Sequence, residues 1–249
     1  MLILVVSAVS LRRDQGSEGL ENLMRKIWRR ICGALSGLAL LATTAAAQDM
    51  PSAVGRIIYS DALQPGAAIC SGVLVAPDLV LTAAHCVRAA AEDPATLRFD
   101  AGWTDGHPTA RRLGRAVILA ADTLPPGLAG LAQDMALVRL DTAFGPDEAT
   151  PLPLAAPSDG VFVLHAFART APAHPAPAIP CDLLATRPGL LGLDCPVVSG
   201  NSGAPLLQGD GEGLHITAVM VAAARIGPVR AWAVLPAGAL LAQISPKAE

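Results

Sequence analysis

The sequence predicts an all-β protein, and three observations lead to this fold class. From residue 54 onward, short apolar runs are separated by Gly, Pro and Asp, the pattern of β-strands joined by turns. Few segments have the apolar period of about 3.6 residues that an amphipathic helix requires. The 202 residues from 48 to 249 are enough for two small barrels that share a cleft.

Eight segments carry the strand pattern, because each is a short apolar run bounded by turn residues. These predicted strands are 69–75, 79–82, 116–120, 136–140, 161–166, 204–207, 215–223 and 231–235. Helical structure is limited to a predicted turn at 83–90 and a closing helix at 237–244. The proline-rich segment 144–160 is predicted to be the crossover between the two barrels.

The first 47 residues have the features of an upstream extension followed by a signal peptide. A basic segment at 25–30 precedes an apolar segment at 31–41, and Ala45-Ala46-Ala47 then forms an A-x-A cleavage site. We therefore expect cleavage after Ala47, with an uncleaved membrane anchor as the alternative. Met24 directly precedes the basic segment, so the chain has two candidate starts, Met1 and Met24.

The charge of residues 48–249 argues against a nucleic-acid partner. This part of the chain has 12 Lys and Arg against 18 Asp and Glu, a net charge of about −6. It has no basic stripe of the kind that attracts phosphate backbones. The local cluster of Arg111, Arg112 and Arg115 is predicted to be a solvated strand face.

Cysteine content agrees with export to an oxidising compartment. Cys32 leaves with the signal peptide, and four cysteines remain, which can pair in three ways: Cys70, Cys86, Cys181 and Cys195. Disulfides persist only where thiols are not kept reduced. A zinc site is the competing interpretation, but the spacings contain no Cys-x-x-Cys motif, so we expect no metal.

Three residues that lie far apart in the sequence supply the chemistry of a nucleophilic hydrolase. A hydroxyl is a poor nucleophile until an adjacent imidazole takes its proton, and a buried carboxylate must hold that imidazole in the correct tautomer. The candidates for these roles are Ser202, His85 and Asp134.

Each of these residues also has a purely structural interpretation. His85 alone could be a core histidine, Asp134 a turn residue before a strand, and Ser202 a solvent-facing turn serine. The motifs around them favour the catalytic interpretation. The other histidines of this part match no motif and are predicted to be surface or structural: His107, His165, His174 and His215.

The motifs that carry these residues resemble the chymotrypsin/trypsin superfamily of serine proteases. They are Leu-Thr-Ala-Ala-His-Cys at 81–86, Asp-Met-Ala-Leu at 134–137 and Gly-Asn-Ser-Gly-Ala-Pro at 200–205. Cys-Ser-Gly-Val-Leu-Val at 70–75 is similar to the same family. The order His, Asp, Ser is that of the two-barrel enzymes, and the similarity extends from about residue 54 to residue 221.

The resemblance implies two six-stranded antiparallel Greek-key barrels, with the active site in the cleft between them and a short C-terminal helix. We expect His85 and Asp134 on an N-terminal barrel at 48–155 and Ser202 on a C-terminal barrel at 156–249. It also implies a Cys70–Cys86 disulfide, which leaves Cys181 to pair with Cys195.

In this family the backbone amides of the residues matching Gly200 and Ser202 form the oxyanion hole. The residue before the nucleophile is Asn201, whereas vertebrate-type members have an Asp that pairs with a newly cut amino terminus. No Ile-Val-Gly-Gly start is present either. Gly-Asn-Ser-Gly is similar to bacterial V8-like members, so we expect no proteolytic switch of that type.

The resemblance assigns the substrate pocket to Pro196, Met220, Val221 and Ala222. Pro196 stands where trypsin-like cleavage after Lys or Arg needs a carboxylate, and Asp194 is two residues away. Met220 stands where glutamyl endopeptidases have a histidine, although a shift in register would bring His215 to that place. Apolar walls favour an apolar or small P1 residue.

Taken together, the resemblance implies an exported serine endopeptidase, periplasmic or extracellular. We expect a monomer that acts on protein or peptide substrates through an acyl-enzyme, without cofactor, metal, nucleic acid or, after signal cleavage, membrane association. The alternatives are a catalytically silent binding module on the protease fold and an esterase that uses the same triad.

Overall fold

The computed structural model describes residues 50–59, 69–104, 106–224 and 227–244. The predicted signal peptide, its cleavage after Ala47 and the start at Met24 lie outside the described residues. Within those ranges, none of the helices has the length and hydrophobicity that a transmembrane span requires.

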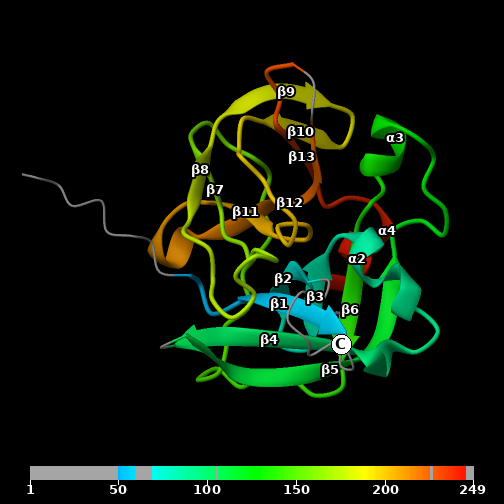
Figure 1. Cartoon of the computed structure of the whole chain (residues 1–249), viewed down its shortest axis with the longest axis vertical. Coiled ribbons are helices and arrows are strands. Elements are labelled where there is room, and N and C mark those ends of the chain that lie inside the picture. The colour runs from blue at the N-terminus through cyan, green and yellow to red at the C-terminus, as the bar shows by residue number, and fades with distance from the viewer. Residues whose placement is uncertain (1–49, 60–68, 105, 225–226, 245–249) are drawn as a thin grey trace, which may run out of the picture. The chain divides into compact units, whose positions relative to one another are not determined.

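Six antiparallel strands form a closed barrel in the order β1-β2-β3-β6-β5-β4 (Figure 1). The strands are β1 (Val54–Tyr59), β2 (Ile69–Ala76), β3 (Leu79–Thr82), β4 (Leu97–Thr104), β5 (His107–Leu119) and β6 (Ala136–Leu140). The pairing of β1 with both β2 and β4 closes the ring. This barrel has the six strands expected for the first half of the protein.

The second half forms one seven-stranded sheet in the order β8-β7-β11-β12-β13-β10-β9. Its strands are β7 (Phe162–Leu164), β8 (Ile179–Cys181), β9 (Leu183–Arg187), β10 (Leu190–Leu193), β11 (Pro205–Gln208), β12 (His215–Ala223) and β13 (Ala231–Val234). The all-β, two-barrel prediction is therefore confirmed, with one difference in strand number.

The seventh strand arises because one extended segment is interrupted at Asp182. β8 and β9 stand at opposite ends of the sheet order, yet only this residue separates them in the sequence. The segment pairs with β7 before Asp182 and with β10 after it, so the sheet curls back on itself. At the interruption, the Asp182 N–H donates to Asp194 Oδ1 at 2.8 Å and the Asp194 N–H donates to the Asp182 carbonyl at 3.2 Å.

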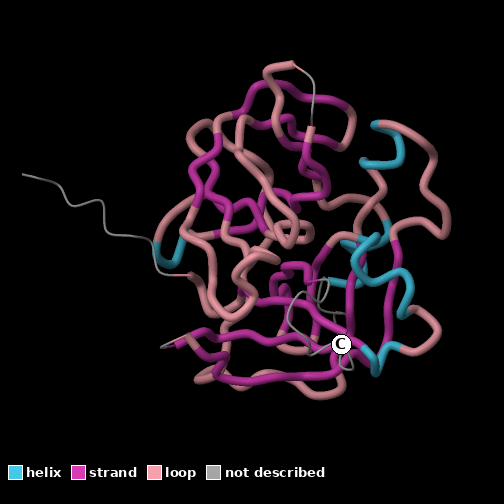
Figure 2. The backbone as a smooth tube through the Cα atoms, in the orientation of Figure 1, coloured by secondary structure: helices cyan, strands magenta, loops and turns pink. Residues whose placement is uncertain are grey.

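Helices are short, and strands and loops make up most of the described chain (Figure 2). The α-helices are α2 (Ala84–Val87), α3 (Leu128–Leu131) and α4 (Ala239–Ile244), and 3₁₀ turns lie at η1 (Arg88–Ala90), η2 (Pro94–Thr96) and η3 (Gly211–Gly213). The predicted helical turn at 83–90 corresponds to α2 and η1, and the predicted closing helix corresponds to α4. The segment between β6 and β7 contains no strand, in agreement with the predicted crossover.

The sequence analysis did not single out β1, β4, β8, β9, β10 or the first half of β5. In β4 the strand signal is nevertheless present, because buried Leu97, Phe99 and Ala101 alternate with polar neighbours. Asp100 lies on the opposite face and is also buried, because its carboxylate accepts hydrogen bonds from the guanidinium groups of Arg56 and Arg98. Because Asp100 is charged yet buried in the middle of the strand, the alternation of apolar and polar residues in β4 is hard to recognise in the sequence.

Two large apolar clusters and one small one make up the core of the described residues. One large cluster fills the second barrel and contains both Cys181 and Cys195. The other large cluster fills the first barrel and continues into the outer face of the second, where it includes Leu190, Val221 and Val234. Because the two barrels share this cluster, apolar burial holds them together along the boundary where the predicted catalytic segments meet.

Two disulfides are present, and they follow the pairing that the resemblance implied. Cys70 is joined to Cys86, and Cys181 is joined to Cys195. The first links β2 to the helical turn that contains His85. The second spans the interrupted segment at Asp182.

Candidate active site

His85 lies in the first turn of α2, directly after β3. The two preceding residues, Ala83 and Ala84, are fully buried, so only small side chains fit where the chain turns out of the barrel. The His85 side chain is 42% exposed. The turn therefore presents the imidazole at the surface while its backbone is anchored in the core.

Asp134 lies two residues before β6, which pairs with β3 so that Ala136 is opposite Thr82. This register brings the carboxylate to the start of α2. Asp134 Oδ1 accepts the backbone N–H of His85 at 2.8 Å, and Oδ2 lies 2.6 Å from His85 Nδ1. The Asp134 side chain is only 5% exposed. Because Nδ1 faces the carboxylate, Nε2 is left as the basic nitrogen.

The backbone of Ser202 is bonded to the first barrel. The Ser71 N–H donates to the Ser202 carbonyl at 2.8 Å, and the neighbouring Cys70 is disulfide-bonded to Cys86, which follows His85. A ring nitrogen of His85 lies within 4.8 Å of both sulfur atoms. In the described part of the chain the Ser202 hydroxyl makes no hydrogen bond, so main-chain contacts bring this residue to the His85 segment.

The geometry around His85 also bears on the zinc interpretation of the cysteines. Cys70, Cys86 and His85 form a group close enough to hold a metal ion. Both sulfurs are in a disulfide, however, and neither can supply the thiolate that zinc requires.

Glycines on both sides of Ser202 are required by the backbone. Gly200 has φ of 104° and Gly203 has φ of 81°, values that favour glycine. A Cβ on Gly203 would collide with the Ser71 carbonyl oxygen and with Thr82 Oγ1. A Cβ on Gly200 would lie 2.6 Å from the Arg169 nitrogen. The loop can therefore pack against its neighbours only because these positions lack side chains.

Between residues 199 and 203, some backbone N–H and C=O groups are hydrogen-bonded within the described structure and others are not. The four carbonyls from Ser199 to Ser202 all accept hydrogen bonds. The N–H groups of Asn201 and Gly203 donate to Val198 and Met220. Among the described residues, the N–H groups of Gly200 and Ser202 have no acceptor. The loop of Ser202 thus has two amide donors that no described residue uses.

Asn201 is buried, with 1% exposure, and both ends of its amide are hydrogen-bonded within the second barrel. Its Oδ1 accepts the Val198 N–H at 2.8 Å, and its Nδ2 donates to the Phe167 carbonyl at 3.0 Å. A neutral side chain therefore holds this loop, and no buried charge is left that would need an ionic partner.

The four residues predicted to line the substrate pocket differ in burial. Met220 is buried inside the second barrel, whereas the next residue, Val221, belongs to the cluster shared with the first barrel. Ala222 is half-buried and lies opposite Trp232 on β13. Pro196 is exposed. Of this set, Met220 has the closest link to the nucleophile, because its carbonyl accepts the Gly203 N–H at 2.7 Å.

Two polar residues considered for specificity are engaged elsewhere. Asp194 Oδ1 accepts the Asp182 N–H beside the second disulfide. His215 begins β12 and its Nδ1 lies 2.8 Å from the Gly213 carbonyl, at the end of that strand away from Met220. Among the described residues, neither side chain is hydrogen-bonded to the loop of Ser202.

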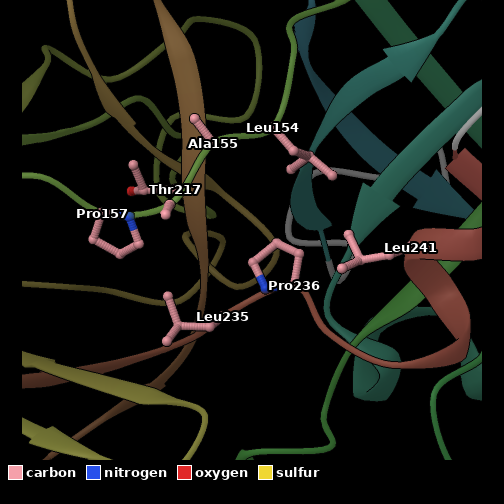
Figure 3. A pocket seen from close by; sticks show the side chains of 8 residues that line it. Leu154, Ala155, Pro157, Thr217, Leu235, Pro236 and Leu241 are labelled. Atoms are coloured by element: carbon pink, nitrogen blue, oxygen red, sulfur yellow. The ribbon is translucent and has the colours of Figure 1, made fainter.

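A separate apolar pocket of about 380 Å³ lies between the crossover segment, β12, β13 and α4 (Figure 3). Its lining includes Leu154, Pro157, Leu235 and Leu241, with Thr217 as the one polar contribution. No residue of the predicted triad lines it, and it is distinct from the candidate site.

Burial shifts the pKa values of two groups outside the triad. Desolvation lowers the pKa of His165, which is only 2% exposed. Burial raises the pKa of Tyr59, whose hydroxyl donates to the Cys86 carbonyl at 3.4 Å. The remaining histidines are predicted to be surface or structural residues, and burial assigns His165 to the structural ones.

Sequence reasoning missed several residues that hold the nucleophile loop. Ser71 and the segment 167–169 contact this loop through hydrogen bonds, and the Thr82 hydroxyl donates to the Ser71 carbonyl. Ser71 and Thr82 lie inside motifs that the sequence analysis used, but the partners of a hydroxyl are not readable from a motif. The segment 167–169 carries no comparable signal.

Comparison with known proteins agrees with this architecture. The family model described as "Trypsin-like peptidase domain" matches residues 70–214, more than half of the chain. The fold is similar to that of AL20, a thermostable serine protease from an extremophilic microorganism. The TM-score is 0.52 and the identity 17%, with coverage of 74% of this chain and 91% of that one.

A second similar structure is a scabies mite inactivated protease paralogue, S-D1. Its TM-score is 0.56 and its identity 10%, with coverage of 74% of this chain and 87% of that one. At these identities the two structures inform the fold alone. No curated protein sequence matches the chain.

Proposed function

Since the chain belongs to the family of trypsin-like peptidase domains, we propose that it is a serine endopeptidase that hydrolyses peptide bonds through an acyl-enzyme. One observation carries this proposal above the others. His85 is bonded to Asp134 through both carboxylate oxygens, while two amide groups that have no acceptor among the described residues flank Asn201 in the loop of Ser202.

The proposed reaction assigns one role to each group. Ser202 Oγ attacks the substrate carbonyl as His85 Nε2 takes its proton, and Asp134 stabilises the imidazolium. The oxygen of the tetrahedral intermediate accepts hydrogen bonds from the Gly200 and Ser202 amides. The C–N bond then breaks, and His85 returns the proton to the leaving amine.

Deacylation repeats these steps with water as the nucleophile. His85 takes a proton from water as it attacks the acyl-enzyme, and then returns this proton to Ser202 Oγ as the carboxylic acid product leaves. Every proton and electron pair is accounted for by the triad and the substrate. The chemistry therefore calls for no metal ion or organic cofactor.

We further propose that the protein needs no proteolytic activation of the Ile-Val-Gly-Gly type. The support comes from Asn201, whose amide oxygen accepts the Val198 N–H and whose amide nitrogen donates to the Phe167 carbonyl. In enzymes with an Asp at this place, a new amino terminus must arrive to pair with the carboxylate. A neutral amide that is already satisfied leaves nothing for such a terminus to neutralise.

The proposed substrate is a protein or peptide with a small or apolar P1 residue. This preference is supported by buried Met220 and by Asp194, whose carboxylate is occupied by Asp182. A pocket for Lys or Arg would need a free carboxylate, and a pocket for Glu would need a cation. A cleavage profile from a peptide library tests this directly, and dominance of Lys, Arg or Glu at P1 would contradict it.

Export is the proposed setting, as an enzyme of the periplasm or the extracellular space. The two disulfides support it, because such bonds persist in oxidising compartments. We propose that residues 1–47 are removed and that a monomer of two barrels, 48–155 and 156–249, is the active form. N-terminal sequencing of the exported protein tests the cleavage position.

The decisive experiment is labelling with a fluorophosphonate, which reacts with activated serines. We expect labelling at Ser202, and loss of labelling in the Ser202→Ala and His85→Ala variants. Ser158→Ala, which removes a hydroxyl from the crossover segment, serves as the control and should label like the wild type.

The same experiment separates the alternatives. An unlabelled wild-type protein that folds normally would indicate a catalytically silent binding module on this fold. A labelled protein that turns over simple esters but no peptides would indicate an esterase.

A further inference from the structure

Resting on the proposed function, a further inference concerns how the two free amides are aimed. In a trans peptide the N–H and C=O groups point in opposite directions, so a bond to the carbonyl sets the direction of the amide. The Ser199 carbonyl accepts the Arg169 N–H at 2.8 Å, which orients the Gly200 N–H. The Asn201 carbonyl accepts the Ala204 N–H at 3.0 Å, which orients the Ser202 N–H.

A single residue of the first barrel, Ser71, holds the two neighbouring peptides, Gly200–Asn201 and Ser202–Gly203. Its hydroxyl donates to the Gly200 carbonyl at 2.9 Å, and its N–H donates to the Ser202 carbonyl at 2.8 Å. Ser71 therefore binds the loop on both sides of the peptide that carries the Ser202 amide.

Ser71 is itself fully buried and fully hydrogen-bonded. Its hydroxyl accepts the Phe167 N–H at 2.9 Å, and its carbonyl accepts the Thr82 hydroxyl at 2.8 Å. Donor and acceptor capacities of the hydroxyl are thus both used, and they connect two segments of the second barrel, 167 and 200, to one atom of the first.

We propose that Ser71 is a positioning residue for the oxyanion hole. Its hydroxyl holds the Gly200–Asn201 peptide in the orientation in which both neighbouring amides face the reacting carbonyl. Rotation of this peptide would break the bond to Ser71 and the bond from Asn201 to Val198 together. Because the hydroxyl comes from the other barrel, the oxyanion hole is assembled only when the barrels are docked. Ser71 touches neither substrate nor the reacting atoms.

The test compares Ser71→Ala with Thr217→Val in the protein that begins at residue 48. Thr217 is an equally buried residue whose hydroxyl donates to the Leu206 carbonyl at 3.0 Å inside the second barrel. Both variants remove one buried hydroxyl, but only the first removes it from the nucleophile loop. Activity is expressed per active site titrated with fluorophosphonate, so that partial unfolding does not count as lost catalysis.

We expect Ser71→Ala to lower kcat by about 10-fold with little change in KM, a smaller effect than the ~10²–10³ that loss of an oxyanion donor costs. The affinity for a peptide boronate, which places an oxygen in the oxyanion hole, should fall by the same factor as kcat/KM. Thr217→Val should leave both quantities within about 2-fold of the wild type.

Should Ser71→Ala not fold, Thr82→Val decides the question, because it removes the bond to the Ser71 carbonyl without changing side-chain volume. A fall in kcat and in boronate affinity, smaller but parallel, would support the proposal. Unchanged kcat and boronate affinity in the folded variant would overturn it.

Different results would contradict the proposed function and the role of Ser71. If the wild type and Thr217→Val neither react with fluorophosphonate nor cleave peptides, the proposed function is wrong, and the role of Ser71 falls with it. If both are active and Ser71→Ala matches them per titrated site, the proposed function stands and only the role of Ser71 is wrong.

Discussion

Asp134 contacts His85 twice, through the ring and through the backbone. The bond at Nδ1 selects the tautomer, while the bond to the main-chain N–H fixes where the helical turn begins relative to the carboxylate. A single side chain thus sets both the tautomer and the position of His85, the proposed general base. Both oxygens are used by His85, and within the described residues no hydroxyl donates to this carboxylate.

We predict that Asp134→Asn lowers kcat by about 10³–10⁴-fold, because an amide NH₂ facing Nδ1 favours the wrong tautomer of His85. Peptide turnover per folded protein, followed at several pH values, is the measurement. Asp78→Asn, which removes a carboxylate paired with Arg139 on the first barrel, is the control and should retain full activity. Equal activity in the two variants would exclude Asp134 from the triad.

His165 contributes a pH dependence of stability that is separate from catalysis. Burial lowers its pKa in the folded state, while the unfolded chain has the ordinary value of about 6.5. Stability from the neutral imidazole is therefore fully present above pH ~6.5 and is lost as the pH falls from there toward the folded-state pKa.

We predict that the unfolding free energy falls on acidification below pH ~6.5, by at most about 1.4 kcal/mol per pH unit from this group. Urea unfolding of wild type, His165→Gln and His107→Gln between pH 7.5 and about 5.5 measures the effect. Only His165→Gln should flatten the curve, since His107 is exposed. An unchanged slope in His165→Gln would mean that the buried imidazole is not responsible.

At the scale of elements, the second barrel depends on how one extended segment is divided. β8 and β9 pair with opposite ends of the sheet because the chain shifts at Asp182. The Cys181–Cys195 disulfide and the two bonds between Asp182 and Asp194 hold this shift in place. The disulfide and these two hydrogen bonds hold the chain at Asp182, where the strand pairing is not continuous.

We predict that the double variant Cys181→Ala/Cys195→Ala loses about 3 kcal/mol of stability, the loop entropy expected for a closed loop of this length. Thermal and urea unfolding measure the loss. Addition of dithiothreitol should lower the stability of wild type by more than that of the double variant, which retains only Cys70–Cys86. Equal sensitivity to the reductant would show that the second disulfide contributes nothing.

At the scale of the whole molecule, the candidate site exists only where the barrels meet. His85 and Asp134 come from the first barrel, Ser202 from the second, and the apolar cluster of the first barrel extends into the second. Trp103 on β4 also contacts Phe167, with ring centroids 5.0 Å apart. These contacts make separate unfolding of one barrel costly, because apolar surface of the other would be exposed.

We predict a single cooperative unfolding transition in which both barrels and the activity are lost together. In the protein that begins at residue 48, Trp232→Phe leaves Trp103 as the fluorescent reporter of the first barrel, and Trp103→Phe leaves Trp232 as the reporter of the second. Relative to the circular-dichroism transition of the same variant, each reporter should have the same urea midpoint. Midpoints that differ between fluorescence and circular dichroism would indicate independent barrels.

The sequence was sufficient for the features that depend on local pattern. Strands 79–82, 136–140 and 215–223 are found with the predicted bounds, because short apolar runs between turn residues have few alternatives. It was insufficient where the pattern is interrupted. β4 contains the buried carboxylate of Asp100, and β8 and β9 are too short and too exposed to carry a period.

The sequence by itself determined the all-β class, the motifs and the residue types available for catalysis, since these follow from composition, periodicity and order along the chain. Only the tertiary structure decided which groups meet. The register of β3 on β6 brings Asp134 to His85, and the docking of the barrels brings Ser71 to the Ser202 loop. Hydrogen bonds between segments more than 100 residues apart depend on geometry that no local pattern records, which is why the partners of Ser71 could not be predicted.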